Sequence, residues 1–113
     1  MKIINIIIGE ETAGKCLPLG RRGEHDVLQY RFDLSRWVEM YGDGELTIKV
    51  RRNGDAEPYT GTLERVGHDA LWTISARETD KAGAGRVEFK YTTAGKRRRV
   101  KIQDYDFFVI DAS

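Results

Sequence analysis

The sequence is poor in cysteine and proline, and neither sign of charge is in surplus. Cys16 is the single cysteine among 113 residues, so neither an intrachain disulfide nor a zinc site built from several cysteines can form. Lysine and arginine together number 19 and aspartate and glutamate 18, which leaves a formal net charge of +1. A dedicated nucleic-acid-binding domain usually has a clear basic excess. The length and composition predict one globular domain, residues 1–113, around a single core.

A long hydrophobic run is also lacking at the start of the chain. The opening apolar run, from Ile3 to Ile8, is interrupted by Asn5 and is followed by Gly9 and two glutamates. A secretory signal peptide needs a longer apolar segment and a small-residue cleavage site, and a membrane-spanning helix needs about 20 apolar residues. We therefore expect this run to form a β-strand.

Apolar and polar residues alternate with a period of two over much of the chain, which predicts half-buried β-strands. The alternation is clearest in four segments: 27–34, 45–50, 71–75 and 86–91. Together with the opening run and the closing segment 100–110, they predict seven or eight short strands. Glycine-rich turns separate them, and two short helical turns are expected, one capped by Ser35 and one by Thr79. The fold class that we expect is all-β, an immunoglobulin-like antiparallel β-sandwich.

A run of four cations, residues 96–99, precedes Lys101. We expect a hairpin in which segment 86–91 returns as 97–102, with Arg97, Arg99 and Lys101 sharing one strand face. The favoured interpretation is a solvated face paired across the hairpin with acidic residues such as Glu88. The other interpretation is a contact with a polyanion or an acidic partner through Arg97, Arg99 and Lys101.

Residues with catalytic chemistry form no recognisable constellation. His25 and His68 fall in expected loops without metal-ligand spacing, and no serine lies in a nucleophile elbow. A lone thiol such as Cys16 is more often buried than activated. We therefore expect no enzymatic activity, no metal site and no cofactor.

The opening isoleucines are apolar on both faces of their expected strand, which predicts cover on both sides, either within the chain or by another subunit. The candidate association surface consists of these isoleucines and one loop tyrosine: Ile3, Ile4, Ile6, Ile7, Ile8 and Tyr59. Most other aromatic residues fall on the inward side of their strands, so core packing is favoured over a sugar-stacking platform. Tyr59, which follows Pro58 in an expected loop, is the aromatic residue least committed to the core.

The order of turns and aromatic residues between residues 19 and 111 is also informative. The segments concerned are Gly20-Arg21-Arg22-Gly23-Glu24, Phe32-Asp33-Leu34-Ser35-Arg36-Trp37, Gly42-Asp43-Gly44, Arg52-Asn53-Gly54-Asp55, Pro58-Tyr59, Leu71-Trp72-Thr73, Thr79-Asp80, Gly83-Ala84-Gly85 and the closing strand from Lys101 to Val109. In this order and spacing the chain resembles the small immunoglobulin-like domains at or near the N-termini of tail, baseplate and fibre proteins of phages and prophages of Gram-positive bacteria. The N-terminal domain of upper-baseplate proteins is the best-known domain of this type.

The resemblance implies a non-enzymatic structural module of the virion that joins a tail or baseplate to a fibre or receptor-binding portion. It implies other tail, baseplate or fibre proteins as partners and a homo-oligomer, with a trimer favoured because tail fibres are commonly threefold. The implied location is the phage tail, or the bacterial cytoplasm before assembly; neither a membrane nor nucleic acid is an expected partner. The alternative function is a β-sandwich module that binds carbohydrate or a polyanion.

Overall fold

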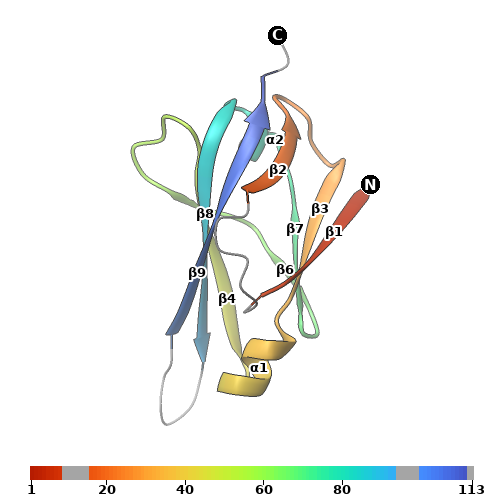
Figure 1. Cartoon of the computed structure of the whole chain (residues 1–113), viewed down its shortest axis with the longest axis vertical. Helices are drawn as coiled ribbons and strands as arrows, with labels where there is room; N and C mark the ends of the chain where they lie inside the picture. Colours follow the sequence, from red (N-terminus) through yellow and green to blue (C-terminus); the bar gives the residue numbers. More distant parts are fainter. Residues whose placement is uncertain (9–15, 94–99, 112–113) are drawn as a thin grey trace.

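Two β-sheets pack face to face as a sandwich in the computed structural model, which describes residues 1–8, 16–93 and 100–111 (Figure 1). One sheet has the strand order β1-β3-β7-β6 and the other β2-β9-β8-β4-β5. The first sheet contains β1 (Lys2–Ile7), β3 (Leu28–Asp33), β7 (Asp69–Thr73) and β6 (Glu64–Val66). The second contains β2 (Cys16–Arg21), β9 (Val100–Ile110), β8 (Gly83–Thr93), β4 (Gly44–Arg51) and β5 (Tyr59–Thr60).

The expected all-β sandwich is confirmed, with more strands in its described part than the sequence predicts. Two of the nine strands among the described residues, β5 and β6, have only two and three residues, too short for a period-two pattern to reveal. The ladders are antiparallel except at two sheet edges, where β1 runs parallel to β3 and β2 runs parallel to β9. The sheet edges formed by β1 and β2 therefore differ from the expected antiparallel pattern.

Aromatic side chains from both sheets meet in the core. In β3, Tyr30 and Phe32 point inward and are 1% and 0% exposed, as the alternation predicts. Phe32 meets Phe89 of the opposite sheet at a ring-centroid distance of 4.4 Å, and Phe89 meets Tyr105 edge-on at 5.7 Å. Burial of these large rings supplies much of the hydrophobic stabilisation of a small sandwich.

Helix α1 (Ser35–Tyr41) closes one end of the sandwich. Ser35 is its first helical residue and not its cap; the Asp33 carboxylate accepts the Ser35 backbone N–H at 2.9 Å. The hydrogen bonds to Ser35 hold the pKa of Asp33 below its ordinary value. Trp37, 1% exposed, packs on Tyr91 at 5.6 Å, so the helix seals the core at this end.

Helix α2 (Ala76–Thr79) ends where the sequence predicts a helical turn to begin. Thr79 is its last residue, and Ser75 occupies the capping position. The Glu78 carboxylate accepts the Ser75 backbone N–H at 2.9 Å and the Ser75 hydroxyl at 2.8 Å. This Ser-x-x-Glu capping arrangement overrides the expected cap at Thr79 because it satisfies free donors at the helix start.

The β8–β9 hairpin differs in register from the expected one. β8 continues through Thr93, and Lys101 lies opposite Tyr91 while Glu88 lies opposite Asp104. The expected pairing of the cationic face with Glu88 is therefore wrong for Lys101. The reason is that Tyr105 and Phe107 occupy the core, which places Lys101 on their side of the strand, whereas Glu88 lies on the outward face of β8.

Candidate association surface

Strand β1 is an edge strand whose isoleucines divide between two faces. Ile6 and Ile8 are 4% and 0% exposed and Ile4 packs against the core from a partly buried position, whereas Ile3 and Ile7 are 51% and 45% exposed. Within the part of the chain that the structure describes, nothing covers the outward face of β1. The cover on both sides that the apolar pattern predicts is thus not supplied by these residues.

The outward row next to β1 is polar. On β3, Arg31 donates to the Asp69 carboxylate, with Nε at 2.8 Å from Oδ2, and Gln29 donates to the Thr73 hydroxyl at 2.9 Å. These contacts run away from β1, across the β3–β7 pair. The exposed isoleucines therefore form a narrow apolar strip along β1, bordered by the polar outward side chains of β3.

A second apolar surface lies on the outward face of β9, in the other sheet. Its members are exposed to about half: Val100 (48%), Ile102 (53%), Phe108 (47%) and Ile110 (51%). Asp104 and Asp106 separate the two apolar pairs on the same face, and Asp106 lies 3.4 Å from Arg86 in an exposed ion pair. Sequence reasoning did not single out this surface. The Phe107-Phe108 doublet could have revealed it. Successive side chains of a strand point to opposite faces, so only one of the two rings can face the core.

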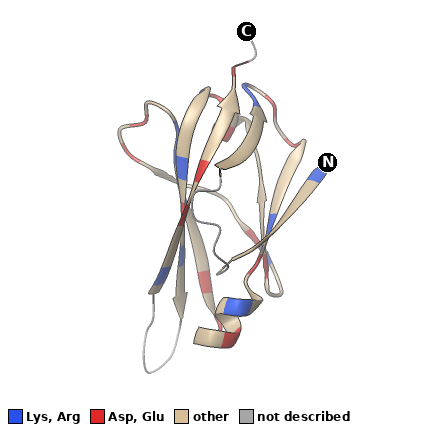
Figure 2. Cartoon of the chain, in the orientation of Figure 1, with Lys and Arg blue, Asp and Glu red and all other residues tan. Residues whose placement is uncertain are grey.

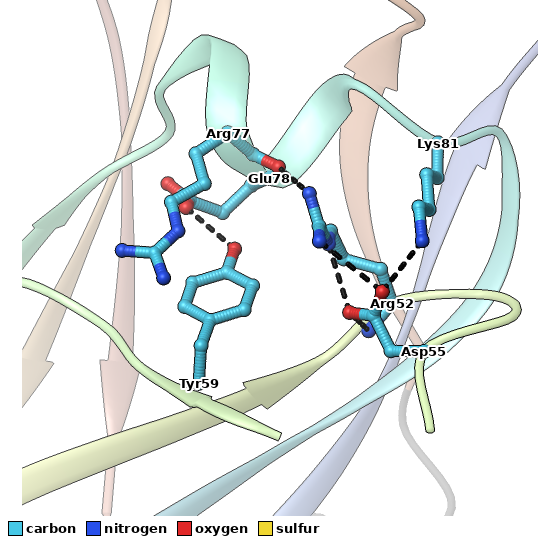
Figure 3. A network of polar contacts seen from close by, with 6 residues as sticks. All are labelled: Arg52, Asp55, Tyr59, Arg77, Glu78 and Lys81. Atoms are coloured by element: carbon cyan, nitrogen blue, oxygen red, sulfur yellow. Dashed lines mark hydrogen bonds and ion pairs between the residues drawn. The ribbon is translucent and has the colours of Figure 1, made fainter. Parts of the chain in front are cut away.

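Tyr59 is held in place by three side chains, as Figure 3 shows. Its hydroxyl donates to Glu78 Oε2 at 2.8 Å, and its ring lies 3.8 Å from the guanidinium of Arg77 and 5.0 Å from that of Arg52. Burial, followed by the hydrogen bond to Glu78, raises the pKa of Tyr59 above its ordinary value. Tyr59 begins β5, in the other sheet from β1, and does not lie in the expected loop; its contacts join the start of β5 to α2.

Asp55 organises a second set of contacts beside Tyr59 (Figure 3). The carboxylate is 7% exposed and accepts from Arg52 Nε at 2.8 Å and from Lys81 Nζ at 2.7 Å. These two hydrogen-bonded cations, Arg52 first, hold the pKa of Asp55 well below its ordinary value. Arg52 also donates to the backbone carbonyl of Arg77 at 3.0 Å, which couples the loop after β4 to α2.

The sequence alone does not predict this network. The Arg52–Asp55 spacing is local, but Lys81 lies 26 residues away. The pairing depends on the loop after β4 folding back against the α2–β8 connection. The network joins separate segments of the chain, and the Asp55 carboxylate is hydrogen-bonded to cationic side chains of the same chain.

Of the candidate polyanion contact, the structure describes only one residue. Arg97 and Arg99 lie outside the described residues. Lys101 is exposed and lines a cavity of ≈ 340 Å³ together with Tyr41, Tyr91, Thr93 and Val100. Figure 2 shows basic and acidic residues interspersed along the described strands.

The described residues contain no group of three or more histidine, cysteine or acidic side chains that could hold a metal ion. His25 makes an exposed contact with Asp26 at 3.1 Å.

No helix within the described ranges is both long and apolar enough to cross a membrane. Compared with models of protein families and with curated proteins, the sequence matches none of them.

Proposed function

We propose that the chain is a non-enzymatic structural module of a phage or prophage virion, which assembles with tail, baseplate or fibre proteins through the outward faces of its strands. The observation that carries the proposal is the exposure of large aliphatic side chains on two strands in different sheets, β1 and β9. Two separate apolar surfaces suit a connector that contacts neighbours on two sides.

The size of these surfaces sets the kind of assembly that is expected. A stable protein–protein interface usually buries about 800 Å² on each partner. A strip with Ile3 and Ile7 as its exposed apolar side chains is smaller than that, so each contact is weak alone. In a virion many copies lie side by side, and linked weak contacts give high overall avidity. The motif order between residues 19 and 111 supports this setting, because it resembles domains of tail and baseplate proteins.

The test is the location of the chain in particles. Phage particles induced from the bacterium that carries the gene are purified on a density gradient, and their proteins are identified by mass spectrometry. We expect the chain at a fixed ratio to known tail proteins, and gold-labelled antibodies at the tail or its tip. Its absence from intact particles, together with its presence in the lysate, would refute the proposed function.

A polyanion-binding function is the second candidate, supported by the exposed Lys101 beside a cavity that two tyrosines line. It predicts binding to an anionic polymer that weakens steeply with salt and is lost in the Arg97→Ala, Arg99→Ala double variant. Equal binding by the parent and the variant, or by neither, excludes it. A carbohydrate platform has less support, because Phe108 is the one aromatic side chain that is exposed among the described residues.

A further inference from the structure

We propose that strand β1 pairs with β1 of a second copy of this chain, antiparallel, about a twofold axis that passes through Asn5. The inference deepens the proposed assembly function and rests on it for its setting, since it names the partner of the β1 surface. It follows from the backbone edge of β1, from the sequence of the strand and from the exposure of its side chains.

Among the described residues, the backbone groups of β1 that have no partner belong to Ile3, Asn5 and Ile7. Lys2 donates its N–H to Val27 O at 2.9 Å, and Ile8 donates to Asp33 O at 3.0 Å. In a parallel pair, alternate residues direct both backbone groups to the same neighbour. The even-numbered residues of β1 therefore bond to β3, and the odd-numbered ones direct N–H and C=O toward the open edge, where Figure 1 shows no further strand beside β1.

The strand reads the same in both directions around Asn5: Ile3-Ile4-Asn5-Ile6-Ile7. In an antiparallel pair centred there, Ile3 lies opposite the partner's Ile7 and Asn5 lies opposite the partner's Asn5. Both members of each such pair direct their N–H and C=O toward the partner strand, so each pair exchanges two N–H···O bonds. The free groups of the odd-numbered residues are thereby satisfied without any change in the β1–β3 ladder.

The side chains match in the same register. The exposed Ile3 and Ile7 cover each other at both ends of the outward face, and the Asn5 amides, each with a donor and an acceptor, meet at the centre. A slip by two residues would place an amide opposite an isoleucine, so the asparagine specifies the register. Lys2 lies opposite the partner's Ile8, and the two lysines are at opposite ends of the pair.

The edge lacks the devices that usually prevent strand pairing. Between residues 2 and 7 there is no proline, and the single charged residue, Lys2, shares the core-facing side with Ile4 and Ile6 but lies exposed at the first position of the strand. Self-complementarity of this kind defines an isologous, twofold contact, whereas a threefold ring uses two different surfaces. The β1 edge thus favours a dimer contact over the trimer that the resemblance implies.

The register can be tested by cross-linking in a Cys16→Ser background, which removes the exposed native thiol. Opposed residues in a hydrogen-bonded antiparallel pair have Cα atoms about 5.5 Å apart, within disulfide range. We expect Asn5→Cys to form a disulfide-linked dimer under mild oxidation at least tenfold faster than the matched control Ile3→Cys, because two Ile3 positions lie far apart. The double variant Ile3→Cys, Ile7→Cys restores cross-linking. Equal rates for the two single variants overturn the register.

Self-association without cross-linking is measured by sedimentation equilibrium, from about 5 µM to about 1 mM because a small interface is expected to be weak. We expect a monomer–dimer equilibrium whose association constant falls at least tenfold in Ile7→Lys. Val66→Lys is the matched control, since Val66 is exposed to the same extent (48%) on β6 at the opposite edge of the sheet. Circular dichroism confirms that both variants are folded.

A further variant, Asn5→Pro, removes an edge-directed N–H but no β1–β3 bond, so it abolishes the dimer and leaves the fold intact. A monomer at every concentration, or an oligomer that Ile7→Lys leaves unchanged, overturns the β1 pairing. Either result leaves the proposed virion function standing if the chain is found in particles. Absence from particles refutes that function and says nothing against a dimer in solution, so the two failures are distinguishable.

Discussion

Replacing Asp55 by alanine removes the acceptor that holds Arg52 and Lys81 together. The carboxylate is 7% exposed, Arg52 is 18% exposed and Lys81 is 41% exposed. Loss of one partner from a fully buried ion pair costs about 3–5 kcal/mol, and an exposed pair contributes less than about 1 kcal/mol. Lys81 is screened by solvent and adds little, so the free energy of unfolding should fall by about 2 kcal/mol, mainly through Arg52.

The loss is measurable by urea unfolding, followed through the fluorescence of Trp37 and Trp72, both 1% exposed. For a domain of this size, about 2 kcal/mol corresponds to a fall in Tm of roughly 8 °C. Asp106→Ala is the matched control, because Asp106 and its partner Arg86 are 54% and 64% exposed. We expect less than about 0.5 kcal/mol for the control. Equal losses in the two variants would refute the reasoning.

The pH dependence provides a second check on Asp55. Its pKa in the folded protein is held below the ordinary value of 3.8, so the unfolded chain takes up a proton first as the pH falls. The stabilisation by the carboxylate is therefore complete at neutral pH and is lost progressively below about pH 4. The stability difference between the parent and Asp55→Ala should narrow over that range, and a constant difference would contradict the assignment.

Three further measurements address other parts of the fold. Tyr59→Phe removes the hydrogen bond to the nearly buried Glu78 and should lower the free energy of unfolding by about 1–2 kcal/mol; an unchanged urea midpoint would show that the bond contributes nothing. Burial raises the folded-state pKa values of Tyr30 and Tyr59 above 10.0, so the stability that these neutral side chains contribute is complete below pH 10 and is lost above it. Phenolate absorbance of these residues should therefore appear only with unfolding. Its earlier appearance would contradict their burial. Gly85→Ala places a methyl group against the Phe107 ring and 2.6 Å from the Arg51 carbonyl oxygen. It should lower the free energy of unfolding by about 1–3 kcal/mol, measured by thermal unfolding. A Tm equal to that of the parent would show that the strands can shift without cost.

Local patterns predicted the parts of the fold whose causes are local. The alternation from Leu28 to Asp33 identifies the inward face of β3 because successive side chains of a strand point to opposite sides. Trp37 could be placed on a short helix ending at Gly42, whose φ of 88° suits glycine. The start of α2 was missed although its signal is local, since Ser75 and Glu78 have capping-box spacing.

The candidate site depended more on relations across the chain. The apolar pattern of β1 predicted cover on both faces, but the place of β1 at the edge of a sheet follows from the strand order. The inward register of β9 is decided by Tyr105 and Phe107 against the opposite sheet, which turns Val100 and Ile102 outward. The residues of a short segment such as 97–102 do not show how that segment packs against the opposite sheet.

The sequence by itself determined that this chain forms a β-sandwich, because strand periodicity and turn residues act over a few neighbouring positions. It also contains the palindrome around Asn5, a property that can be read without coordinates. Only the tertiary structure decided which backbone groups of β1 bond to β3 and which isoleucines are exposed. The same holds for Asp55, whose partner Lys81 is brought to 2.7 Å across 26 residues. Strand order and loop closure are set by the whole core, and a local pattern does not contain them.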